Sequence, residues 1–231
     1  TSAVATAERN VIKIINKVAG AENPLNITLD NATIKSDSKA AMKISGEGDV
    51  NIELNGSNVL TSGKAHAGLE KNDDDSDGRL TIRDDLKNDG TEKTGEEKKA
   101  EEDAVAAGKS GDAVKVVGSL TATGGNNGVG RYGGAGIGGG CEAYYSGTSK
   151  STSSIVIDGG KITATGGRVN KNDPDDRSQT ITINGGNIEA TGIGGGAFYT
   201  GGGDGAVTIT GGHILSTAQY GAGIGGGWGD D

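Results

Sequence analysis

Lys161-Ile162-Thr163-Ala164-Thr165 is the first of three copies of one phrase. The later copies are Asn187-Ile188-Glu189-Ala190-Thr191 and His213-Ile214-Leu215-Ser216-Thr217. A short β-branched run precedes each copy, at residues 155–157, 181–183 and 207–209. The copies return at a fixed period, which is typical of stacked-repeat proteins in which each unit buries its apolar face against its neighbours.

The alternation inside the phrase has a period of two, because Ile162 and Ala164 are apolar whereas Thr163 and Thr165 are polar. This is the spacing of a β-strand and not of a helix. Looser copies occur at residues 117–124, 52–63 and 27–34. Roughly 26 residues supply two or three short strands with their turns. The sequence therefore predicts an all-β protein that folds as a parallel β-helix, with about 26 residues in each rung.

A glycine-rich segment closes each unit. Ala135-Gly136-Ile137-Gly138-Gly139-Gly140 returns in closely similar form at residues 192–196 and 222–227. One apolar residue flanked by glycines suits a tight corner at which neighbouring backbones approach closely. Most of the 45 glycines are therefore expected to serve the architecture.

The composition excludes several classes of protein. Aromatic residues make up 3% of the chain and hydrophobic residues 32%, which favours a thin stacked core over a thick globular one. The net charge of −9 argues against nucleic acid as a partner. No stretch approaches the roughly 20 apolar residues that a membrane span needs, so membrane insertion is not expected. Cys141 is the only cysteine, so no disulfide can form within the chain.

The chain is expected to divide into an N-terminal cap at residues 1–24 and a parallel β-helix at residues 25–231. Apolar residues at helical spacing in residues 3–18 suggest a capping helix, but residues 11–15 could equally form a first strand. An acidic insertion at about residues 83–112 interrupts the repeat. Within it, Thr94-Gly95-Glu96-Glu97 resembles a capping box and predicts a short solvated helix over residues 96–107.

Residues 73–84 match the spacing of an EF-hand-type calcium loop. Carboxylates stand at the first, third, fifth and twelfth positions, namely Asp73, Asp75, Asp77 and Asp84, and glycine stands at the sixth. Calcium prefers six to eight oxygen ligands, and this spacing would turn alternate side chains toward one ion. Two features weaken the match, because Asp84 is shorter than the usual glutamate and no clear helix precedes the loop. The alternative is an acidic turn between rungs.

Catalytic and nucleotide-binding functions find little support. His66 and His213 are the only histidines, and the chain is predicted not to be an enzyme. The pattern G-x-G-x-x-G occurs three times but always as a repeat corner, with no helix behind it. Two unbroken columns of threonine on one flat face would favour ice binding, but Glu189 and Leu215 interrupt the column of Thr121 and Thr163.

Residues 26–32, residues 52–63 and the repeated Ala-Gly-Ile-Gly-Gly-Gly resemble glycine-rich modules in secreted, cell-surface proteins of clostridia-like bacteria. Those modules are often classed as carbohydrate-binding domains of the pectate-lyase-like β-helix superfamily. The resemblance covers about residues 25–231. It implies a right-handed parallel β-helix, an extracellular or cell-surface location, and polysaccharide binding with calcium as a possible cofactor. The acidic stretch 70–112 departs from the pattern, so no function is carried over to it.

The leading hypothesis is a non-catalytic extracellular module that binds a polysaccharide or a cell-surface glycan, or acts as an adhesin. Aromatic residues in or beside the glycine-rich returns could stack on sugar rings, although they could equally cover the corners of the rod. The candidates are Tyr132, Tyr144, Tyr145, Tyr199, Tyr220 and Trp228. One alternative is a structural rod or a filament subunit that associates end to end, and a third hypothesis is a calcium-dependent polysaccharide lyase.

Overall fold

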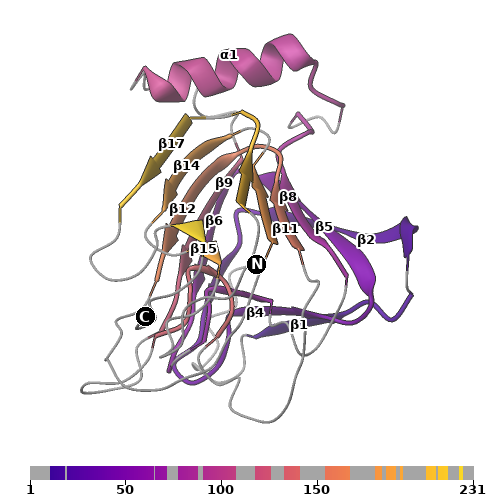
Figure 1. Cartoon of the computed structure of the whole chain (residues 1–231), viewed down its shortest axis with the longest axis vertical. Coiled ribbons are helices and arrows are strands. Elements are labelled where there is room, and N and C mark those ends of the chain that lie inside the picture. Colours follow the sequence, from indigo (N-terminus) through magenta and orange to yellow (C-terminus); the bar gives the residue numbers. More distant parts are fainter. Residues whose placement is uncertain are drawn as a thin grey trace.

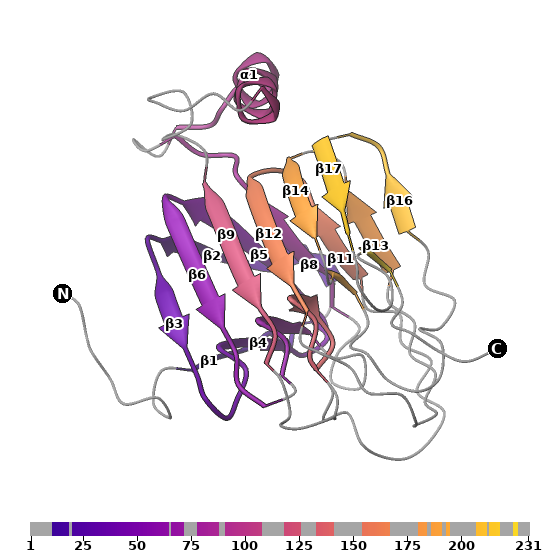
Figure 2. The same ribbon diagram turned by 90° about the vertical axis from the view of Figure 1, so that its left-hand side faces the viewer.

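Three parallel six-stranded sheets and one helix make up the described part of the chain. The structure is a computed structural model. It describes residues 11–18, 20–64, 66–71, 78–87, 91–107, 118–125, 133–140, 154–166, 180–183, 186–190, 193–194, 207–211, 213–217 and 224–225. Successive strands of the chain fall in different sheets, so each sheet grows by one strand at a time along the stack (Figures 1 and 2).

Sheets A, B and C are named here by their strands, given in order of pairing. Sheet A contains β1 (Ile12–Ile15), β4 (Met42–Ser45), β7 (Leu69–Lys71), β10 (Ile137–Gly138), β15 (Ile193–Gly194) and β18 (Ile224–Gly225). Sheet B contains β2 (Gly20–Asp30), β5 (Gly48–Asn55), β8 (Leu80–Arg83), β11 (Ser154–Ile157), β13 (Thr180–Ile183) and β16 (Val207–Ile209). Sheet C contains β3 (Thr33–Lys35), β6 (Ser57–Thr61), β9 (Ser119–Thr123), β12 (Lys161–Thr165), β14 (Asn187–Ala190) and β17 (His213–Ser216).

The core lies between the sheets and consists of aliphatic side chains stacked in register. In sheet B, each residue of one such column pairs with the next one along the sheet; the column is Ile27, Ile52, Ile82, Ile157, Ile183 and Ile209. Its middle members Ile52, Ile82 and Ile157 are fully buried. At the end of the column, Ile209 is 53% exposed because no described strand follows β16 in the sheet.

Asn58 is a polar residue inside this apolar core. It pairs with Leu120, and the same column continues through Ile162 and Ile188. Its side chain is fully buried and makes three hydrogen bonds, accepting one from the Ala32 amide at 2.9 Å and donating two to main-chain carbonyls at 3.1 Å. Because its polar groups are satisfied, the burial of this amide is tolerated.

The predicted fold class needs correction. The sequence predicted an all-β, right-handed parallel β-helix with about 26 residues in each rung and a charged insertion, and this prediction is wrong as stated. The described strands form three stacked parallel sheets, and α1 (Gly95–Ala106) belongs to the structure as well. The step between paired residues is also not uniform. Ile157 pairs with Ile183, one repeat further on, whereas Ile82 pairs with Ile157 across a much longer stretch of chain.

Two local predictions can be compared with the structure. Of the two alternatives for residues 11–15, the structure has the strand, β1 at Ile12–Ile15, and residues 1–10 lie outside the described part. The helix predicted at 96–107 is confirmed as α1 (Gly95–Ala106). It lies beyond the edge of sheet C at which the strands begin, over the middle of the stack (Figure 2).

Candidate functional site

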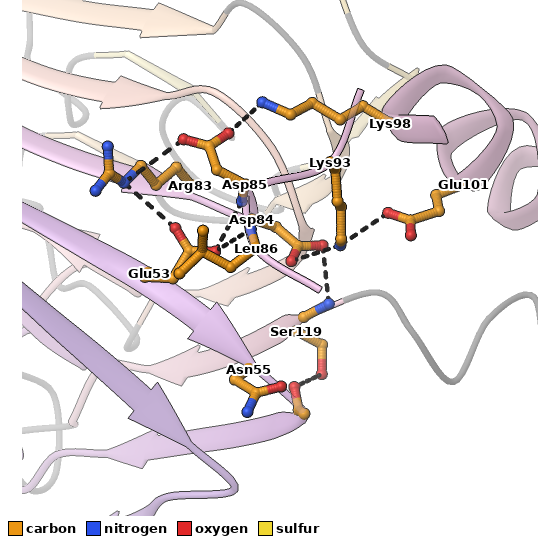
Figure 3. A network of polar contacts seen from close by, with 12 residues as sticks. Glu53, Asn55, Arg83, Asp84, Asp85, Leu86, Lys93, Lys98, Glu101 and Ser119 are labelled. Atoms are coloured by element: carbon orange, nitrogen blue, oxygen red, sulfur yellow. Dashed lines mark hydrogen bonds and ion pairs between the residues drawn. The ribbon is translucent and has the colours of Figure 1, made fainter. Parts of the chain in front are cut away.

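A cluster of charged side chains joins the end of β8 to α1 (Figure 3). We call it the charged cluster. It consists of Glu53, Arg83, Asp84, Asp85, Lys93, Lys98 and Glu101. β5 supplies Glu53 and β8 supplies Arg83, whereas Asp84 and Asp85 follow β8 directly. The remaining members come from the segment that precedes α1 and from α1 itself.

Lys93 occupies the centre of the cluster. Its Nζ lies 2.8 Å from Oδ1 of Asp84 and 3.0 Å from Oε2 of Glu101. The side chains of Lys93 and Asp84 are only 1% and 3% exposed, and that of Glu101 is 17% exposed. The second oxygen of Asp84, Oδ2, accepts a hydrogen bond of 2.9 Å from the Gly118 amide. One ammonium group is thus enclosed by two carboxylates with little access for water.

Burial and neighbouring charges shift the pKa values of Lys93, Asp84 and Glu101 in opposite directions. Burial tends to lower the pKa of Lys93, but its contacts with Asp84 and Glu101 outweigh this and raise it. Burial raises the pKa of Asp84 despite the neighbouring ammonium and the Gly118 amide. Burial likewise raises the pKa of Glu101, although Lys93 acts against that rise. The ammonium is held in its charged form at neutral pH, while both carboxyl groups are unusually ready to bind a proton.

Glu53 fixes the turn that follows β8. Its Oε1 accepts hydrogen bonds from the amides of Asp85 at 2.7 Å and Leu86 at 2.8 Å. Its Oε2 lies 3.3 Å from Nε of Arg83, in an ion pair without the angles of a hydrogen bond. The side chain is 5% exposed, and this burial raises the pKa of Glu53. The carboxylate therefore holds the chain where it leaves the sheet.

The start of α1 has the capping box that the sequence predicted. The Glu97 amide donates to the Thr94 hydroxyl at 3.2 Å, and the Thr94 amide donates to Oε2 of Glu97 at 2.8 Å. Lys87 pairs with the other oxygen of Glu97 at 2.8 Å. The hydrogen bond with Lys87 is the main reason why the pKa of Glu97 falls to about 2, and the Thr94 amide adds to it. Lys98, one residue further on, forms an ion pair with Asp85.

The cluster as a whole attaches a polar helix to the sheets. Three ion pairs join α1 to Lys87, Lys93 and Asp85 in the preceding segment, and Ala104 is the one buried apolar residue among the described side chains of the helix. A helix with so little apolar surface gains little from hydrophobic packing, so charge supplies most of its attachment.

Asp84 is the one member of the predicted calcium loop that the structure describes. Its two oxygens contact the Lys93 ammonium and the Gly118 amide. Asp73, Asp75 and Asp77 lie outside the described residues. Within the described part of the chain, no group of three or more His, Cys, Asp or Glu side chains is arranged to hold a metal ion. Calcium binding at residues 73–77 stays a prediction.

The aromatic residues predicted to bind sugar cannot be placed. Tyr132, Tyr144, Tyr145, Tyr199, Tyr220 and Trp228 all lie outside the described residues.

The structure does place the threonine columns. In sheet C, Thr121 pairs with Thr163, Thr163 with Glu189, and Glu189 with Leu215, which is the order that the sequence predicted. Beside this column, Thr61 pairs with Thr123, and Thr123 with Thr165.

These threonines form a polar face on the outside of sheet C, which we call the hydroxyl face. It consists of Ser57, Thr61, Ser119, Thr121, Thr123, Thr163 and Thr165. All seven alternate with buried residues of the same strands and are at least partly exposed. In a parallel sheet, neighbouring strands lie about 4.8 Å apart and alternate residues of one strand lie about 6.6 Å apart. The hydroxyl groups therefore form a regular array, which Val59 and Lys161 interrupt at the other two outward positions of β6 and β12.

Sequence reasoning missed a second charged group, on sheet A. Nδ1 of His66 lies 2.7 Å from Oε2 of Glu70, and Nζ of Lys43 lies 3.5 Å from the other oxygen. The Glu70 side chain is only 1% exposed. Glu70 follows the apolar Leu69 in β7, and simple strand alternation would turn it to the outer face, yet all three residues of the strand are buried. The i,i+4 spacing of His66 and Glu70 was the one signal available.

The comparisons with protein-family models, with curated proteins and with solved structures find no match to this chain. The resemblance to glycine-rich carbohydrate-binding modules therefore stays a prediction from the residues that suggested it. In the described residues, α1 does not have the length and apolarity needed to cross a bilayer.

Proposed function

We propose that this chain is a non-catalytic extracellular module that binds an extended polysaccharide through the hydroxyl face of sheet C. The observation that carries the proposal is the in-register repetition of threonine across β6, β9 and β12. A polysaccharide presents its own hydroxyl groups at regular intervals. A threonine hydroxyl can both donate and accept hydrogen bonds, so it can match a sugar hydroxyl in either role.

The charge of the protein favours a neutral polysaccharide. The seven members of the hydroxyl face are uncharged, Lys161 beside Ser119 is the one charged residue at the outward positions of β6, β9 and β12, and the chain as a whole carries a net charge of −9. A polyanionic glycan would meet long-range repulsion from the protein, most strongly at low salt. Cell-surface glycans and neutral structural polysaccharides are therefore the ligands to test first, with adhesion as the biological role.

Retention on insoluble neutral polysaccharides, in calcium and again in EDTA, tests this function. The double variant Thr121→Ala/Thr163→Ala removes two hydroxyls from the face. At about 1 kcal/mol for each hydrogen bond lost, its affinity should fall about 30-fold. The matched control is Thr28→Ala/Thr208→Ala, which removes two exposed hydroxyls from sheet B. Equal binding by both double variants, or no retention of the wild type, would rule out binding through the hydroxyl face.

A second candidate function is end-to-end assembly into a rod or filament. Apolar side chains are exposed on the strands at both ends of the stack: Ile12, Ile15 and Leu25 at one end, Ile209 and Leu215 at the other. A second copy of the chain could cover both sets by adding its first strands beside β16 and β17, since edge strands offer unpaired main-chain groups. Sedimentation over a range of protein concentrations tests this assembly. Ile209→Lys is expected to abolish any association of the wild type. A wild-type protein that stays monomeric at all concentrations would contradict end-to-end assembly.

A further inference from the structure

Three groups of the charged cluster bring an amine into contact with two carboxyl groups. Lys93 supplies an amine, Asp84 a carboxyl group 2.8 Å away, and Glu101 a second carboxyl group 3.0 Å from the same nitrogen. The amine and the Asp84 carboxyl are almost entirely shielded from water. Holding two reacting groups in contact converts a slow reaction between separate molecules into a fast one within a single molecule.

Lys93 and Asp84 form a short, buried salt bridge, in which Nζ lies 2.8 Å from Oδ1. Oδ2 accepts the Gly118 amide at 2.9 Å. A main-chain N–H that already points at this oxygen would stabilise the negative charge that develops on it when the carboxyl carbon is attacked.

We propose that Lys93 and Asp84 become joined by an amide bond between Nζ and Cγ, an isopeptide cross-link that the folded protein forms by itself. A proton first moves from the ammonium to the carboxylate, which gives a neutral amine and a neutral carboxylic acid. Nζ then attacks Cγ, and Oδ2 takes up the charge beside the Gly118 amide. Glu101 removes a proton from Nζ and delivers it to the departing hydroxyl group.

The reaction balances without any outside reagent. An amine and a carboxylic acid give an amide and one molecule of water, so no oxidant, reductant or activating nucleotide is needed. Water that is released from a buried site is not readily replaced, which favours the amide over its hydrolysis. Burial raises the pKa of Asp84, which favours the neutral carboxylic acid that Nζ attacks, whereas the raised pKa of Lys93 opposes the first proton transfer and makes the reaction slow. Glu101 touches the reacting nitrogen and acts as the proton carrier.

The cross-link would fasten the start of the α1 segment to the end of β8. The attachment of α1 relies on ion pairs, several of which are partly exposed to water. An amide bond does not depend on salt or pH. Exposed ion pairs, in contrast, weaken when the salt concentration rises or when the pH changes the charge of either partner. Asp84 could not then serve as a calcium ligand through two free carboxylate oxygens, so the cross-link and the predicted calcium loop exclude each other at this residue.

The intact mass of the purified folded chain tests the proposal directly. The cross-linked protein must be lighter than its sequence by one molecule of water, and a protease digest must contain one branched peptide that carries both Asp84 and Lys93. The unreacted mass, with the two residues in separate linear peptides after prolonged incubation of the folded protein, would overturn the proposal.

Three variants identify the chemistry. Lys93→Arg keeps the positive charge but has no amine suited to form the amide, so it must show the full mass. Glu101→Gln must slow formation at least about 100-fold, the range of general acid–base catalysis. Lys98→Arg is the matched control, because Lys98 also pairs with an aspartate, Asp85, but is 38% exposed. Lys98→Arg must lose one molecule of water, as the wild type does. If Lys98→Arg showed the full mass and Lys93→Arg did not, the assignment of the cross-link to Lys93 would be contradicted.

Discussion

The ammonium of Lys93 and the carboxylate of Asp84 meet in the interior of the protein, and both are almost completely buried. Such a pair is costly to create, because both charges lose their hydration, and it is costly to break, because the remaining charge has no partner. The pair therefore ties the position of the segment before α1 to the end of β8 more firmly than the exposed ion pairs around it.

Replacing Lys93 with methionine should strongly destabilise the protein. Lys93→Met leaves Asp84 buried beside an apolar group, and removing one member of a buried pair costs about 3 kcal/mol or more. Lys99→Met is the control, because Lys99 forms an exposed ion pair with Asp103 and its loss should cost about 0.5 kcal/mol or less. Urea unfolding of both variants measures the difference, and equal losses would show that the buried pair has no special role.

Asn58 should be difficult to replace although it lies among apolar residues. Asn58→Leu would match its neighbour Leu120 in character, but it would leave the Ala32 amide and two main-chain carbonyls without their side-chain partner. The expected loss in the free energy of unfolding is about 1–3 kcal/mol. Asn51→Leu, in which an exposed amide is replaced, should change stability much less. A stabilising effect of Asn58→Leu in urea unfolding would refute this account.

Gly46 should not accept a side chain. Its φ angle is +102°, a conformation that residues with a Cβ rarely adopt, and a Cβ atom there would overlap the main-chain oxygen of Asn16. Gly46→Ala should therefore cost more than about 1 kcal/mol. Gly95→Ala is the matched control, because a Cβ atom at the first residue of α1 would meet no neighbouring atom within 4 Å. Thermal unfolding compares the two, and the expectation fails if both tolerate alanine equally.

The start of α1 should weaken in acid. The pKa of Glu97 falls from 4.5 to about 2 in the folded protein, so its carboxylate contributes stability that is fully present above about pH 4.5. That contribution is lost as the pH drops through about 2. Hydrogen exchange of the amides at the start of α1, measured between pH 5 and pH 2, should show this loss.

Two variants separate Glu97 from the other carboxylates. Glu97→Gln should remove this part of the pH dependence, whereas Glu96→Gln, an equal change of charge in the same helical turn, should keep it. Asp84 and Glu101 act with the opposite sign, because a raised pKa favours the folded state as the pH falls. The same pH dependence in both glutamine variants would assign the effect to a group other than Glu97.

The repeated phrases predicted the paired positions well. The alternation of Thr121, Thr163, Glu189 and Leu215 along one outer column, and the capping box at Thr94, follow from local sequence alone. The role of Lys93 could not be predicted in this way. It stands in a run of charged residues that looks solvated, and its burial depends on Asp84 and Glu101, which belong to other segments. Asp84 fitted a calcium pattern by spacing, and the spacing gave no sign of the lysine beside it.

The interval between paired residues varies along the chain for a related reason. A period identifies the residues that repeat, but it does not limit the length of chain that a corner can carry between two paired strands. In sheet C, Ile34 pairs with Leu60 at the interval of the repeat, whereas Leu60 pairs with Ala122 after a much longer stretch that contains β7, β8 and α1. Ala122 then pairs with Ala164 after a stretch of intermediate length. The register is set by the neighbouring strand and not by the length of the connection.

The long connection between β8 and β9, which carries α1, has a consequence for the history of such a chain. Making a flexible loop roughly three times longer adds only about 1 kcal/mol to the entropy cost of closing it. Extra sequence can therefore enter at this corner at small thermodynamic cost, while both flanking strands keep their places. The corner after β8 is the point at which related chains can diverge in length, and at which a foreign segment could be grafted with the least disturbance to the rest of the molecule.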